Sequence, residues 1–386
     1  MKEGWEYKKL GEVCETASGG TPSKSHAEYY EGGSIPWLRS GELKRNIVNT
    51  EYCITEEGLK HSSAKMMPQN TVVIAMYGAT VGSVGMLKIN ATTNQAVCGL
   101  LPTTSYVPDF LYYFLLSQKD KFIKAAVGGA QPNISQQKIK NTLAPVPPLP
   151  EQQAIVEELD LLNAIVDKKK AELEELNKLA QSIFYDMFGD PVENEKGWEV
   201  KCMIDVCTKI TDGTHQPPKF LESGIPFIFV SNVRNHRIDY NTEKFISDEE
   251  YARLTKTTPI EIGDILYTSV GSYGNPAMVR SDKKFCFQRH IAILKLKHEV
   301  LDGVFVENFL SNKSVRQYVD TIAIGIAQKT VNLKAIKSIP IILPPLPLQQ
   351  EFATRISAIE AMKEKVEASL SEVQMLLAAT MDKYFG

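Results

Sequence analysis

The fold of this chain is decided by the stretch Pro147-Pro148-Leu149-Pro150-Glu151-Gln152-Gln153 and the residues that follow it, because the same plan occurs twice. The first copy ends at Phe188-Gly189. The second begins at 344–350 with Pro-Pro-Leu-Pro-Leu-Gln-Gln and ends at Phe385-Gly386. Proline fixes its own φ and disfavours helix at the residue before it, so each run predicts a stiff lead-in whose last proline lies in the first turn of a helix. Between each lead-in and its terminal glycine there is neither proline nor glycine.

Both long segments have the apolar spacing of a helix that packs on another helix. Apolar residues recur at alternating intervals of three and four, which is a heptad stripe, and the stripe is interrupted by Lys169 in one copy and by Lys363 and Thr380 in the other. A helix of about 39 residues is about 58 Å long, more than the core of a small domain requires, so we expect the two helices to pack on each other. The stripe consists of Ile155, Leu159, Leu162, Val166, Leu173, Leu176, Ala180, Ile183 and Met187 in the first copy and of Phe352, Ile356, Ile359, Val366, Leu370, Val373, Leu377 and Tyr384 in the second.

The rest of the chain is duplicated as well. Matching residues of the two halves lie 190 to 197 positions apart. They are Gly4-Trp5-Glu6 and Gly197-Trp198-Glu199, Val13-Cys14 and Val206-Cys207, Gly20-Thr21 and Gly213-Thr214, Ile35-Pro36-Trp37 and Ile225-Pro226-Phe227, Gly78 and Gly271, Gln95 and Gln288, and Ile139-Lys140 and Ile336-Lys337. Few of these residues are ones that a core requires, so a tandem duplication explains them better than chance. The predicted parts are a globule at 1–149, a helix at 150–189, a second globule at 190–346 and a second helix at 347–386.

Each globule has the mixed pattern of an α+β domain. Short apolar or alternating runs predict strands at 71–76, 227–230, 265–269 and 290–296, with turns rich in glycine, asparagine and serine. One late helix is predicted in each globule, at 109–126 and 304–322. We expect the aromatic side chains of these helices to lie in the core.

Composition favours a soluble cytoplasmic protein with more than one domain. The chain has 386 residues and no run of eighteen apolar residues, and Met1-Lys2-Glu3-Gly4 does not begin a signal peptide. Its six cysteines form no Cys-x-x-Cys pair and no metal-binding spacing with the six histidines. Reduced thiols that are buried or half-buried are therefore expected.

The net charge of −3 is unevenly distributed. Residues 150–189 carry nine acidic and four basic side chains, and residues 347–386 carry six and four. The predicted helices thus hold the whole negative excess, and the globules are weakly positive. This is compatible with a face turned toward phosphate, although charge alone does not decide the partner.

Polar, glycine-containing turns recur at matched places in both globules. Glycine lets the backbone approach a ligand closely, and Arg, Asn, Gln and Ser read base edges or bind phosphate. Taken singly, each turn is better explained as ordinary chain reversal, and it is the recurrence that favours binding. The candidate DNA-binding residues are Gly20, Thr21, Arg39, Ser40, Tyr77, Gly78, Asn94 and Gln95 in the first half and Thr214, His215, Asn232, Arg234, Ser269, Gly271, Ser272, Gln288 and Arg289 in the second.

Motifs of nucleotide chemistry are missing from the sequence. There is no Gly-x-x-x-x-Gly-Lys-Ser/Thr loop for ATP. Asn275-Pro276-Ala277 lacks the second proline and the aromatic residue of an amino-methyltransferase motif. Glu42-Leu43-Lys44 is the nearest match to a nuclease Glu-x-Lys motif, but without a well-placed aspartate a surface charge pair explains it better. We assign no catalytic residue and no metal ligand.

The whole chain resembles the specificity subunit of type I restriction–modification systems. The resemblance is carried by two globules that each open with Gly-Trp and a Gly-Thr turn, and by the proline-rich lead-ins to the long helices. One departure is Leu348, which stands where the first copy has Glu151. The resemblance implies two pseudo-symmetric target-recognition domains, each reading one half of a split, asymmetric DNA site. It also implies that the two long helices form an antiparallel coiled coil that acts as a ruler.

Partners and cofactors follow from the same resemblance. Two modification subunits, which are methyltransferases, would dock on the helical parts, and restriction subunits would hydrolyse ATP and cleave double-stranded DNA. This chain would then be a non-catalytic subunit with no cofactor of its own, and S-adenosylmethionine, ATP and Mg²⁺ are expected on the partners. Two alternatives stay open. A recognition part fused to a divergent methyltransferase or nuclease would bind methyl donor by itself, and a structural coiled-coil adaptor would show no sequence-specific DNA binding.

Overall fold

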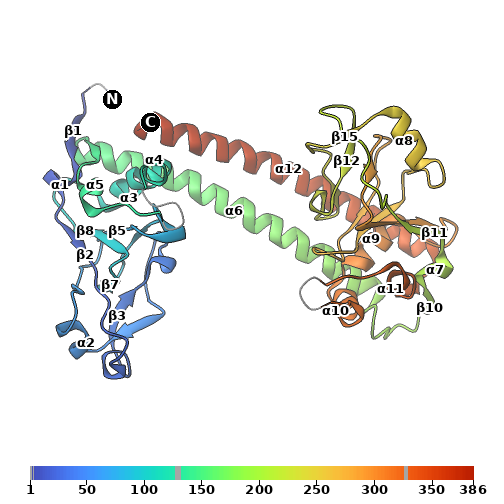
Figure 1. Cartoon of the computed structure of the whole chain (residues 1–386), viewed down its shortest axis with the longest axis horizontal. Coiled ribbons are helices and arrows are strands. Elements are labelled where there is room, and N and C mark those ends of the chain that lie inside the picture. The colour runs from blue at the N-terminus through green and yellow to red at the C-terminus, as the bar shows by residue number, and fades with distance from the viewer. Residues whose placement is uncertain (1, 3, 127–131, 326–328) are drawn as a thin grey trace. The chain divides into compact units, whose positions relative to one another are not determined.

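The computed structural model describes residue 2 and residues 4–126, 132–325 and 329–386. The chain divides into two compact units. Unit 1 comprises Met1–Lys170 and Ala368–Gly386, and unit 2 comprises Ala171–Glu367. Two long helices, α6 (Leu149–Phe188) and α12 (Leu346–Phe385), each contribute one half to unit 1 and the other half to unit 2 (Figure 1).

Unit 1 contains two small sheets and a two-stranded ribbon. The larger sheet has the order β2-β8-β5-β6 with antiparallel neighbours. The smaller has the order β4-β3-β7, in which β3 is antiparallel to β4 and parallel to β7. The ribbon pairs β1 with β9, the strand that leads into α6. The strands are β1 (Glu6–Lys9), β2 (Thr16–Ser18), β3 (Ile35–Leu38), β4 (Tyr52–Ile54), β5 (Val72–Ala75), β6 (Val84–Met86), β7 (Thr92–Thr93), β8 (Val97–Leu100) and β9 (Leu143–Val146).

Short helices complete unit 1. α3 packs on β5 and β6, and the fully buried Phe110 of α3 lies edge-on to Phe385 at the end of α12, with 5.3 Å between the ring centroids. The long helix therefore ends inside the core of the globule. The helices are α1 (Leu10–Val13), α2 (Glu56–Lys60), α3 (Pro108–Ser117), α4 (Lys119–Ala125) and α5 (Gln136–Lys140), and the 3-10 turns are η1 (Ala27–Tyr29), η2 (Ser40–Glu42) and η3 (Gly78–Thr80).

Unit 2 repeats this plan. Its sheets have the orders β11-β19-β16-β17 and β15-β12-β18, its ribbon is β10-β20, and it adds a hairpin, β13-β14. As in unit 1, the central strand of the smaller sheet, β12, has one antiparallel and one parallel neighbour. The strands are β10 (Glu199–Cys202), β11 (Cys207–Asp212), β12 (Ile225–Ile228), β13 (Val233–Arg234), β14 (Arg237–Ile238), β15 (Phe245–Ile246), β16 (Ile265–Thr268), β17 (Pro276–Met278), β18 (Cys286–Phe287), β19 (Ile291–Leu296) and β20 (Pro340–Leu343). The helices are α7 (Met203–Val206), α8 (Asp248–Thr255), α9 (Gly303–Ser311), α10 (Lys313–Ile322) and α11 (Leu333–Lys337), with one 3-10 turn, η4 (Val230–Asn232).

The expected α+β class with two pseudo-symmetric globules and two long packed helices is confirmed. The predicted strands appear as β5, β12, β16 and β19, with their ends shifted by at most two residues. β5 and β16 are central in their sheets and fully buried, which is why both read as nearly unbroken apolar runs.

The prediction of one continuous late helix in each globule is wrong. Both are broken in two, into α3 and α4 at Gln118 and into α9 and α10 at Asn312. Asn312 leaves the helical conformation (φ −57°, ψ 141°), and its side-chain oxygen accepts the backbone N–H of Ser314 at 2.9 Å. An asparagine that caps the next helix in this way competes with continuation of the first. The aromatic residues Phe110 and Phe305 lie in the core as expected.

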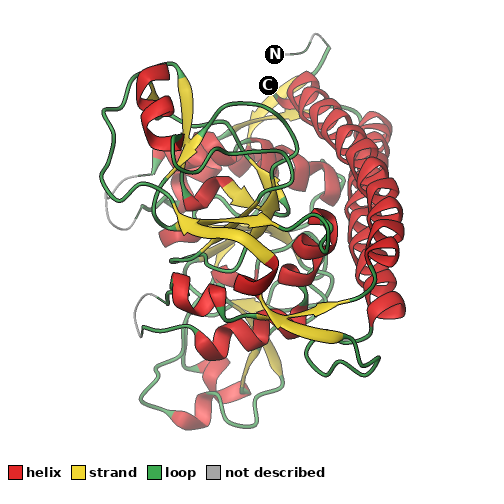
Figure 2. Cartoon of the chain, turned by 90° about the vertical axis from the view of Figure 1, so that its right-hand side faces the viewer, coloured by secondary structure: helices red, strands yellow, loops and turns green. Residues whose placement is uncertain are grey.

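The two long helices lie alongside each other (Figure 2), and within each unit they run antiparallel. In unit 1 the start of α6 lies beside the end of α12, where the Tyr384 hydroxyl donates to Glu158 at 2.6 Å. In unit 2 the Phe188 and Phe352 rings meet edge-on, with 5.2 Å between centroids, and bring the end of α6 to the start of α12. Thr380, read in the sequence as a break in the stripe, is 5 % exposed and so belongs to the packed face.

Two expectations from composition can be compared with the structure. All six cysteines are free thiols, and five of them are buried or half-buried as expected. Cys202 differs, because it lies at the end of the outer ribbon strand β10 and is exposed. Within the described residues, no helix is both long enough and apolar enough to cross a membrane.

Candidate nucleic-acid interface

Gly19 and Gly213 occupy equivalent places at the start of the polar turns. A Cβ atom added at Gly19 would lie 2.1 Å from the carbonyl oxygen of Thr93, and one added at Gly213 would lie 2.2 Å from that of Phe287. Because Thr93 and Phe287 end the equivalent strands β7 and β18, only glycine fits at either place. The sequence match that placed Gly20 on Gly213 is therefore wrong by one residue.

The loops after β7 and β18 follow the same register. Asn94 and Gln288 each donate their backbone N–H to the last residue of the neighbouring central strand, at 2.9 and 3.2 Å. Asn94 is thus the counterpart of Gln288, and Gln95 that of Arg289, so the sequence match of Gln95 with Gln288 is also wrong by one residue. The two units present Asn-Gln and Gln-Arg at the same structural position.

In unit 1 a cavity of about 540 Å³ brings together four of the predicted residues, Thr21, Arg39, Asn94 and Gln95, which are far apart in the sequence. Its volume lies in the range of small-ligand sites. This cavity, the aromatic pocket, has four further lining residues, namely Lys24, Tyr30, Trp37 and Tyr52.

Two aromatic side chains of the pocket are fixed by the turn that carries Thr21. The indole N–H of Trp37, which is 5 % exposed, donates to the carbonyl of Gly20 at 2.9 Å. The hydroxyl of Tyr30 donates to the carbonyl of Pro22 at 2.5 Å. The two rings meet edge-on at 5.9 Å. The turn and both rings therefore form a single preformed wall.

Arg39 and Tyr52 form a second pair in the same pocket. The guanidinium carbon of Arg39 lies 3.6 Å from the centroid of the Tyr52 ring, a close cation–π contact. Its Nη2 also lies 3.2 Å from the carboxylate of Glu51. Glu42, expected from the sequence to be half of a surface charge pair, instead accepts the backbone N–H groups of Arg39 and Glu51 at 2.8 and 2.7 Å, which fixes the η2 turn that begins with Ser40.

The amide side chains of Asn94 and Gln95 form the polar edge of the pocket. The side-chain oxygen of Gln95 accepts a hydrogen bond from the Thr21 hydroxyl, and that of Asn94 accepts the backbone N–H of Ala96 at 3.2 Å. Among the hydrogen bonds between described residues, neither side-chain NH₂ group donates one. Each is therefore able to donate to an acceptor on a ligand.

In unit 2 the cation and the aromatic side chain have exchanged places. Phe229 follows β12 where Arg39 follows β3, and Lys244 stands opposite β12 where Tyr52 stands opposite β3. Alignment of the two halves does not reveal this exchange, because the equivalent residues Arg39 and Phe229 differ in type, and so do Tyr52 and Lys244.

The exchanged side chains of unit 2 belong to a cluster of three phenylalanines. The Phe227 ring lies 5.2 Å from Phe220 and 5.4 Å from Phe229, and Phe220 and Phe229 are 6.4 Å apart. The ammonium of Lys244 lies 5.7 Å from the Phe220 ring. In unit 2 a third ring, that of Phe229, thus packs on the pair equivalent to Tyr30 and Trp37, whereas in unit 1 that pair lines a cavity.

Thr214, His215, Gln288 and Arg289 are brought together at the equivalent turn of unit 2. The backbone N–H of Arg289 donates to the carbonyl of Thr214 at 3.1 Å, and Thr214 forms an isolated parallel β-bridge with Gln288. The His215 ring lies 3.0 Å from the carboxylate of Asp212.

Asn232 has a local structural role. Its side-chain oxygen accepts the backbone N–H of Phe229 at 3.0 Å, and its side-chain nitrogen donates to the carbonyl of Asn241 at 3.1 Å. Both polar groups of the side chain are therefore occupied by the η4 turn and the segment before β15.

The turns after β5 and β16 contain the remaining predicted residues. Gly78 and Gly271 have φ values of +69° and +72°, a conformation that favours glycine. Tyr77 is 43 % exposed, and Ser272 is exposed too. Ser269 is only 6 % exposed; its backbone N–H donates to the carbonyl of His290 at 2.9 Å, and its own carbonyl accepts the backbone N–H of Val331 at 2.8 Å.

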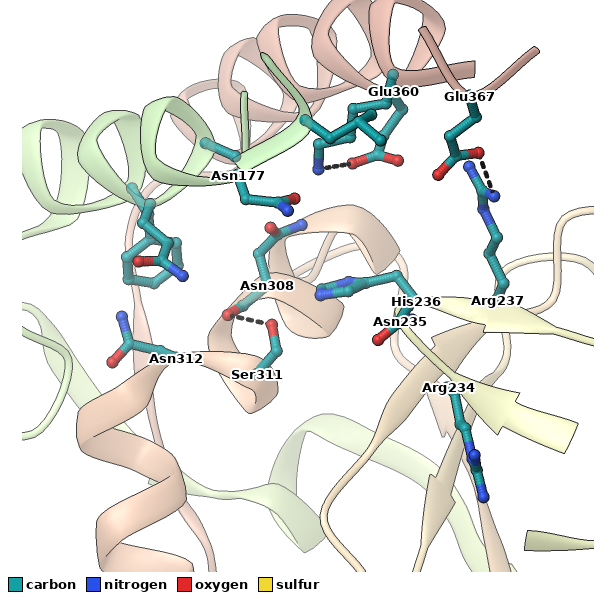
Figure 3. Close-up of a pocket in the computed structure, with 15 residues that line it drawn as sticks. Asn177, Arg234, Asn235, His236, Arg237, Asn308, Ser311, Asn312, Glu360 and Glu367 are labelled. Carbon is teal, nitrogen blue, oxygen red and sulfur yellow. Dashed lines mark hydrogen bonds and ion pairs between the residues drawn. The ribbon is translucent and has the colours of Figure 1, made fainter. Parts of the chain in front are cut away.

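Arg234 lies on the β13–β14 hairpin, in the lining of a different cavity of unit 2. This cavity has a volume of about 530 Å³ and is bounded by the hairpin, α9 and the long helices (Figure 3). Arg237 on the same hairpin pairs with Glu367 of α12 at 2.6 Å. The side chain of Arg234 points away from α12 (Figure 3).

A buried carboxylate, Glu307 of α9, holds this hairpin. Its side chain is 2 % exposed and lies 2.5 Å from Arg280 and 3.3 Å from His236, and it also accepts the backbone N–H of Met278 at 2.7 Å. Burial by itself would raise the pKa of Glu307. The hydrogen bonds and charges of His236 and Arg280 outweigh burial and hold the pKa below its ordinary value.

Sequence reasoning missed the aromatic residues of the pocket in unit 1 and of the equivalent phenylalanine cluster in unit 2. Tyr30 and Phe220 lie 190 positions apart, the same offset that relates Trp37 to Phe227. This repeat is the signal that could have found them. Nothing in the sequence marks Tyr52 or Lys244, because only strand register makes them equivalent.

The family model for the type I restriction modification DNA specificity domain matches residues 2–178 and 195–373. The chain belongs to this family. Each matched segment lies within one half of the duplication, and the resemblance seen in the sequence is confirmed. Within the described part of this specificity-domain protein, no group of three or more His, Cys, Asp or Glu side chains is placed to hold a metal ion.

Two relatives match over nearly the whole length of the chain, and a third matches over about half of it. The MjaIX specificity subunit of Methanocaldococcus jannaschii is 25 % identical over 96 % of this chain and 90 % of its own. The EcoKI specificity subunit of Escherichia coli strain K12 is 25 % identical over 100 % and 89 %. The EcoR124I/EcoR124II specificity subunit of Escherichia coli is 36 % identical over 45 % of this chain and 46 % of its own.

Solved structures share the fold. The S subunit of a type I restriction–modification system from M. genitalium has a TM-score of 0.58 at 17 % identity, with 100 % of this chain and 98 % of that chain covered. A chain from a structural study of complex assembly and conformational transition in a type I system has a TM-score of 0.61 at 19 % identity, with the same coverage.

Proposed function

We propose that this chain is the DNA-binding specificity subunit of a type I restriction–modification complex and that it reads a bipartite, asymmetric site in double-stranded DNA. The observation that carries this proposal is the presence of unlike side chains at equivalent places of two like folds. Arg39 and Tyr52 in unit 1 correspond to Phe229 and Lys244 in unit 2. Two similar folds that carry different side chains at equivalent positions suit a DNA site whose two halves differ in sequence.

Recognition in each globule combines positioning with base discrimination. Lysines and arginines of the globules contact phosphates, so binding is strongly weakened by salt. Side chains of the polar turns then contact base edges. Asn94, Gln95 and Gln288 have the amide groups that pair with adenine, and Arg289 has the guanidinium that pairs with guanine.

The chain acts as a scaffold and catalyses no step itself. Two modification subunits dock on the helical parts, and restriction subunits join this assembly. The long helices α6 and α12 begin in equivalent ways in the two halves, so the chain offers two similar docking places for two copies of the same partner. S-adenosylmethionine, ATP and Mg²⁺ are held by those partners.

Methylation by the reconstituted complex tests this function. The chain with modification subunits is expected to methylate one motif made of two unlike half-sites with a fixed gap, read by modification-sensitive sequencing. The chain alone is expected to transfer no radiolabelled methyl group. Methyl-donor binding or transfer by the chain alone would favour a self-contained enzyme, and a complex without sequence preference would favour a structural adaptor.

A further inference from the structure

The aromatic pocket of unit 1 combines a cavity with surfaces on which a flat ring can stack, and contacts with base edges in a groove require neither. We propose that it receives one nucleobase extruded from the DNA stack. This inference rests on the proposed function, because the base comes from DNA bound by the chain. An extruded base needs a flat surface to stack on, polar groups at its edge and a cavity formed in advance.

The flat surface is provided by Arg39 and Tyr52. Tyr52 is 37 % exposed, and the guanidinium carbon of Arg39 lies over its ring, 3.6 Å from the centroid. Because Glu51 pairs with Arg39, part of the hydrogen-bonding capacity of the guanidinium is already used. Its planar face remains for stacking, as does the exposed part of the Tyr52 ring, and nucleobases stack on both kinds of surface.

The polar edge is provided by Asn94 and Gln95. The side-chain oxygen of Asn94 accepts a hydrogen bond from the backbone N–H of Ala96, and that of Gln95 accepts one from the Thr21 hydroxyl, which orients both amide groups. Their NH₂ groups are left for the carbonyl oxygens and ring nitrogens at the edge of a base. A phosphate that follows the displaced base into the pocket would meet the ammonium of Lys24, which also lines it.

The pocket is preformed, because Trp37 and Tyr30 are anchored to the backbone of one turn at 2.9 and 2.5 Å. The corresponding place in unit 2 is built differently. There Phe229 replaces Arg39, and its ring packs on Phe220 and Phe227. We therefore assign base extrusion to the recognition unit that carries Tyr52.

Fluorescent base analogues test the proposal in the complex of this chain with modification subunits on its own motif. Each base is replaced in turn by a fluorescent analogue that keeps its pairing, such as 2-aminopurine for adenine or pyrrolocytosine for cytosine, whose emission responds to loss of stacking. One position besides the adenines that are methylated is expected to change emission on binding. Tyr52→Leu should abolish that change at saturating protein and weaken DNA binding roughly tenfold, because one stacking surface is removed.

Tyr29→Leu is the matched control. Tyr29 belongs to the same globule, and its ring stacks on His26 and His61 outside the pocket. Its loss should leave the emission change in place. The base-extrusion proposal alone would be overturned if the complex bound its motif specifically while every base other than the methylated adenines stayed stacked. It would also be overturned if the emission change survived Tyr52→Leu or was lost in both variants. A wild-type complex without specific binding would instead refute the proposed function, and extrusion with it.

Discussion

Gln152 and Gln349 make the same three hydrogen bonds in the two halves of the chain. Both side chains are fully buried near the starts of the long helices. Each side-chain nitrogen donates two hydrogen bonds, one to a proline carbonyl of the lead-in at 2.8 Å and one to a carbonyl just before the late helix of the globule, at 2.8 Å for Gln152 and 3.0 Å for Gln349. Each side-chain oxygen accepts a backbone N–H from the same segment, at 2.8 Å for Gln152 and 3.0 Å for Gln349. The partners are Pro147, Ser105 and Val107 in unit 1 and Pro344, Val300 and Asp302 in unit 2. The first glutamine of each Gln-Gln pair thus fastens a long helix to its globule.

Replacing either buried glutamine with leucine should destabilise the protein. Gln152→Leu and Gln349→Leu each leave buried backbone groups without partners, which should lower the free energy of unfolding by about 2–4 kcal/mol. Urea unfolding followed by circular dichroism measures this. The neighbours Gln153 and Gln350 are exposed, so the same substitution there is a matched control and should change stability by less than about 0.5 kcal/mol. Equal losses at the buried and exposed positions would contradict the role given to the hydrogen bonds.

Glu307 should give unit 2 a specific sensitivity to acid. Its pKa is lowered in the folded state, so the ionised carboxylate stabilises the fold at pH values above its ordinary pKa of 4.5, and this contribution is lost as the pH falls through the folded value. Glu307→Gln should therefore cost about 2 kcal/mol at pH 7 and progressively less below about pH 4. Urea midpoints measured from pH 7 to pH 3 would follow this convergence. Glu222→Gln, at an exposed position of the same unit, should track the wild type throughout.

The fold could be predicted because its signals are periodic or repeated. The heptad stripe predicts long helices that pack, and the duplication predicts two like globules. Phe184, Phe188 and Phe385 are buried but lie outside the predicted stripe, because each also packs on a globule: Phe184 and Phe188 contact Phe305 as well as Phe352 of α12, and Phe385 contacts Phe110. The departure at Leu348 also has a structural reason. Glu151 accepts the indole N–H of Trp5 at 2.9 Å, whereas the indole of Trp198 in unit 2 donates to a backbone carbonyl, so no carboxylate is needed there.

The candidate site could be predicted only in part. Thr21, Arg39, Asn94 and Gln95 line one cavity, but no sequence pattern shows that Tyr52 completes it. Register between strands decides which side chains are neighbours, and a one-residue difference in turn length shifts the match between the halves. For the same reason the sequence could not show that the side chain of Asn232 is used within its own turn.

Arg289 should set the preference for one base pair in the half-site that unit 2 reads. Its side chain is exposed in the loop after β18, at the place where unit 1 has Gln95. Arg289→Ala should relax discrimination at one position by about 1–3 kcal/mol and leave the other half-site unchanged. Competition binding with every single-base variant of the motif measures this. Arg253→Ala is the control, because Arg253 is held by Glu250 on α8 at 2.6 Å, and a specificity change there instead would contradict the assignment.

The length of the helical pair should set the gap between the half-sites. α6 passes from unit 1 to unit 2 after Lys170, and α12 passes back after Glu367. Inserting one heptad after each of these residues keeps the apolar stripe in phase and lengthens both helices by about 10 Å. That is about three base pairs at 3.4 Å each. The methylated motif of the variant should keep both half-sites and gain about three base pairs between them, because each globule and its Gln152 or Gln349 anchor is unchanged. A single insertion in α6 alone puts the two stripes out of register and serves as the contrast, with loss of specific methylation expected. Specific methylation at the original gap by the doubly extended chain would show that the helices do not measure the site.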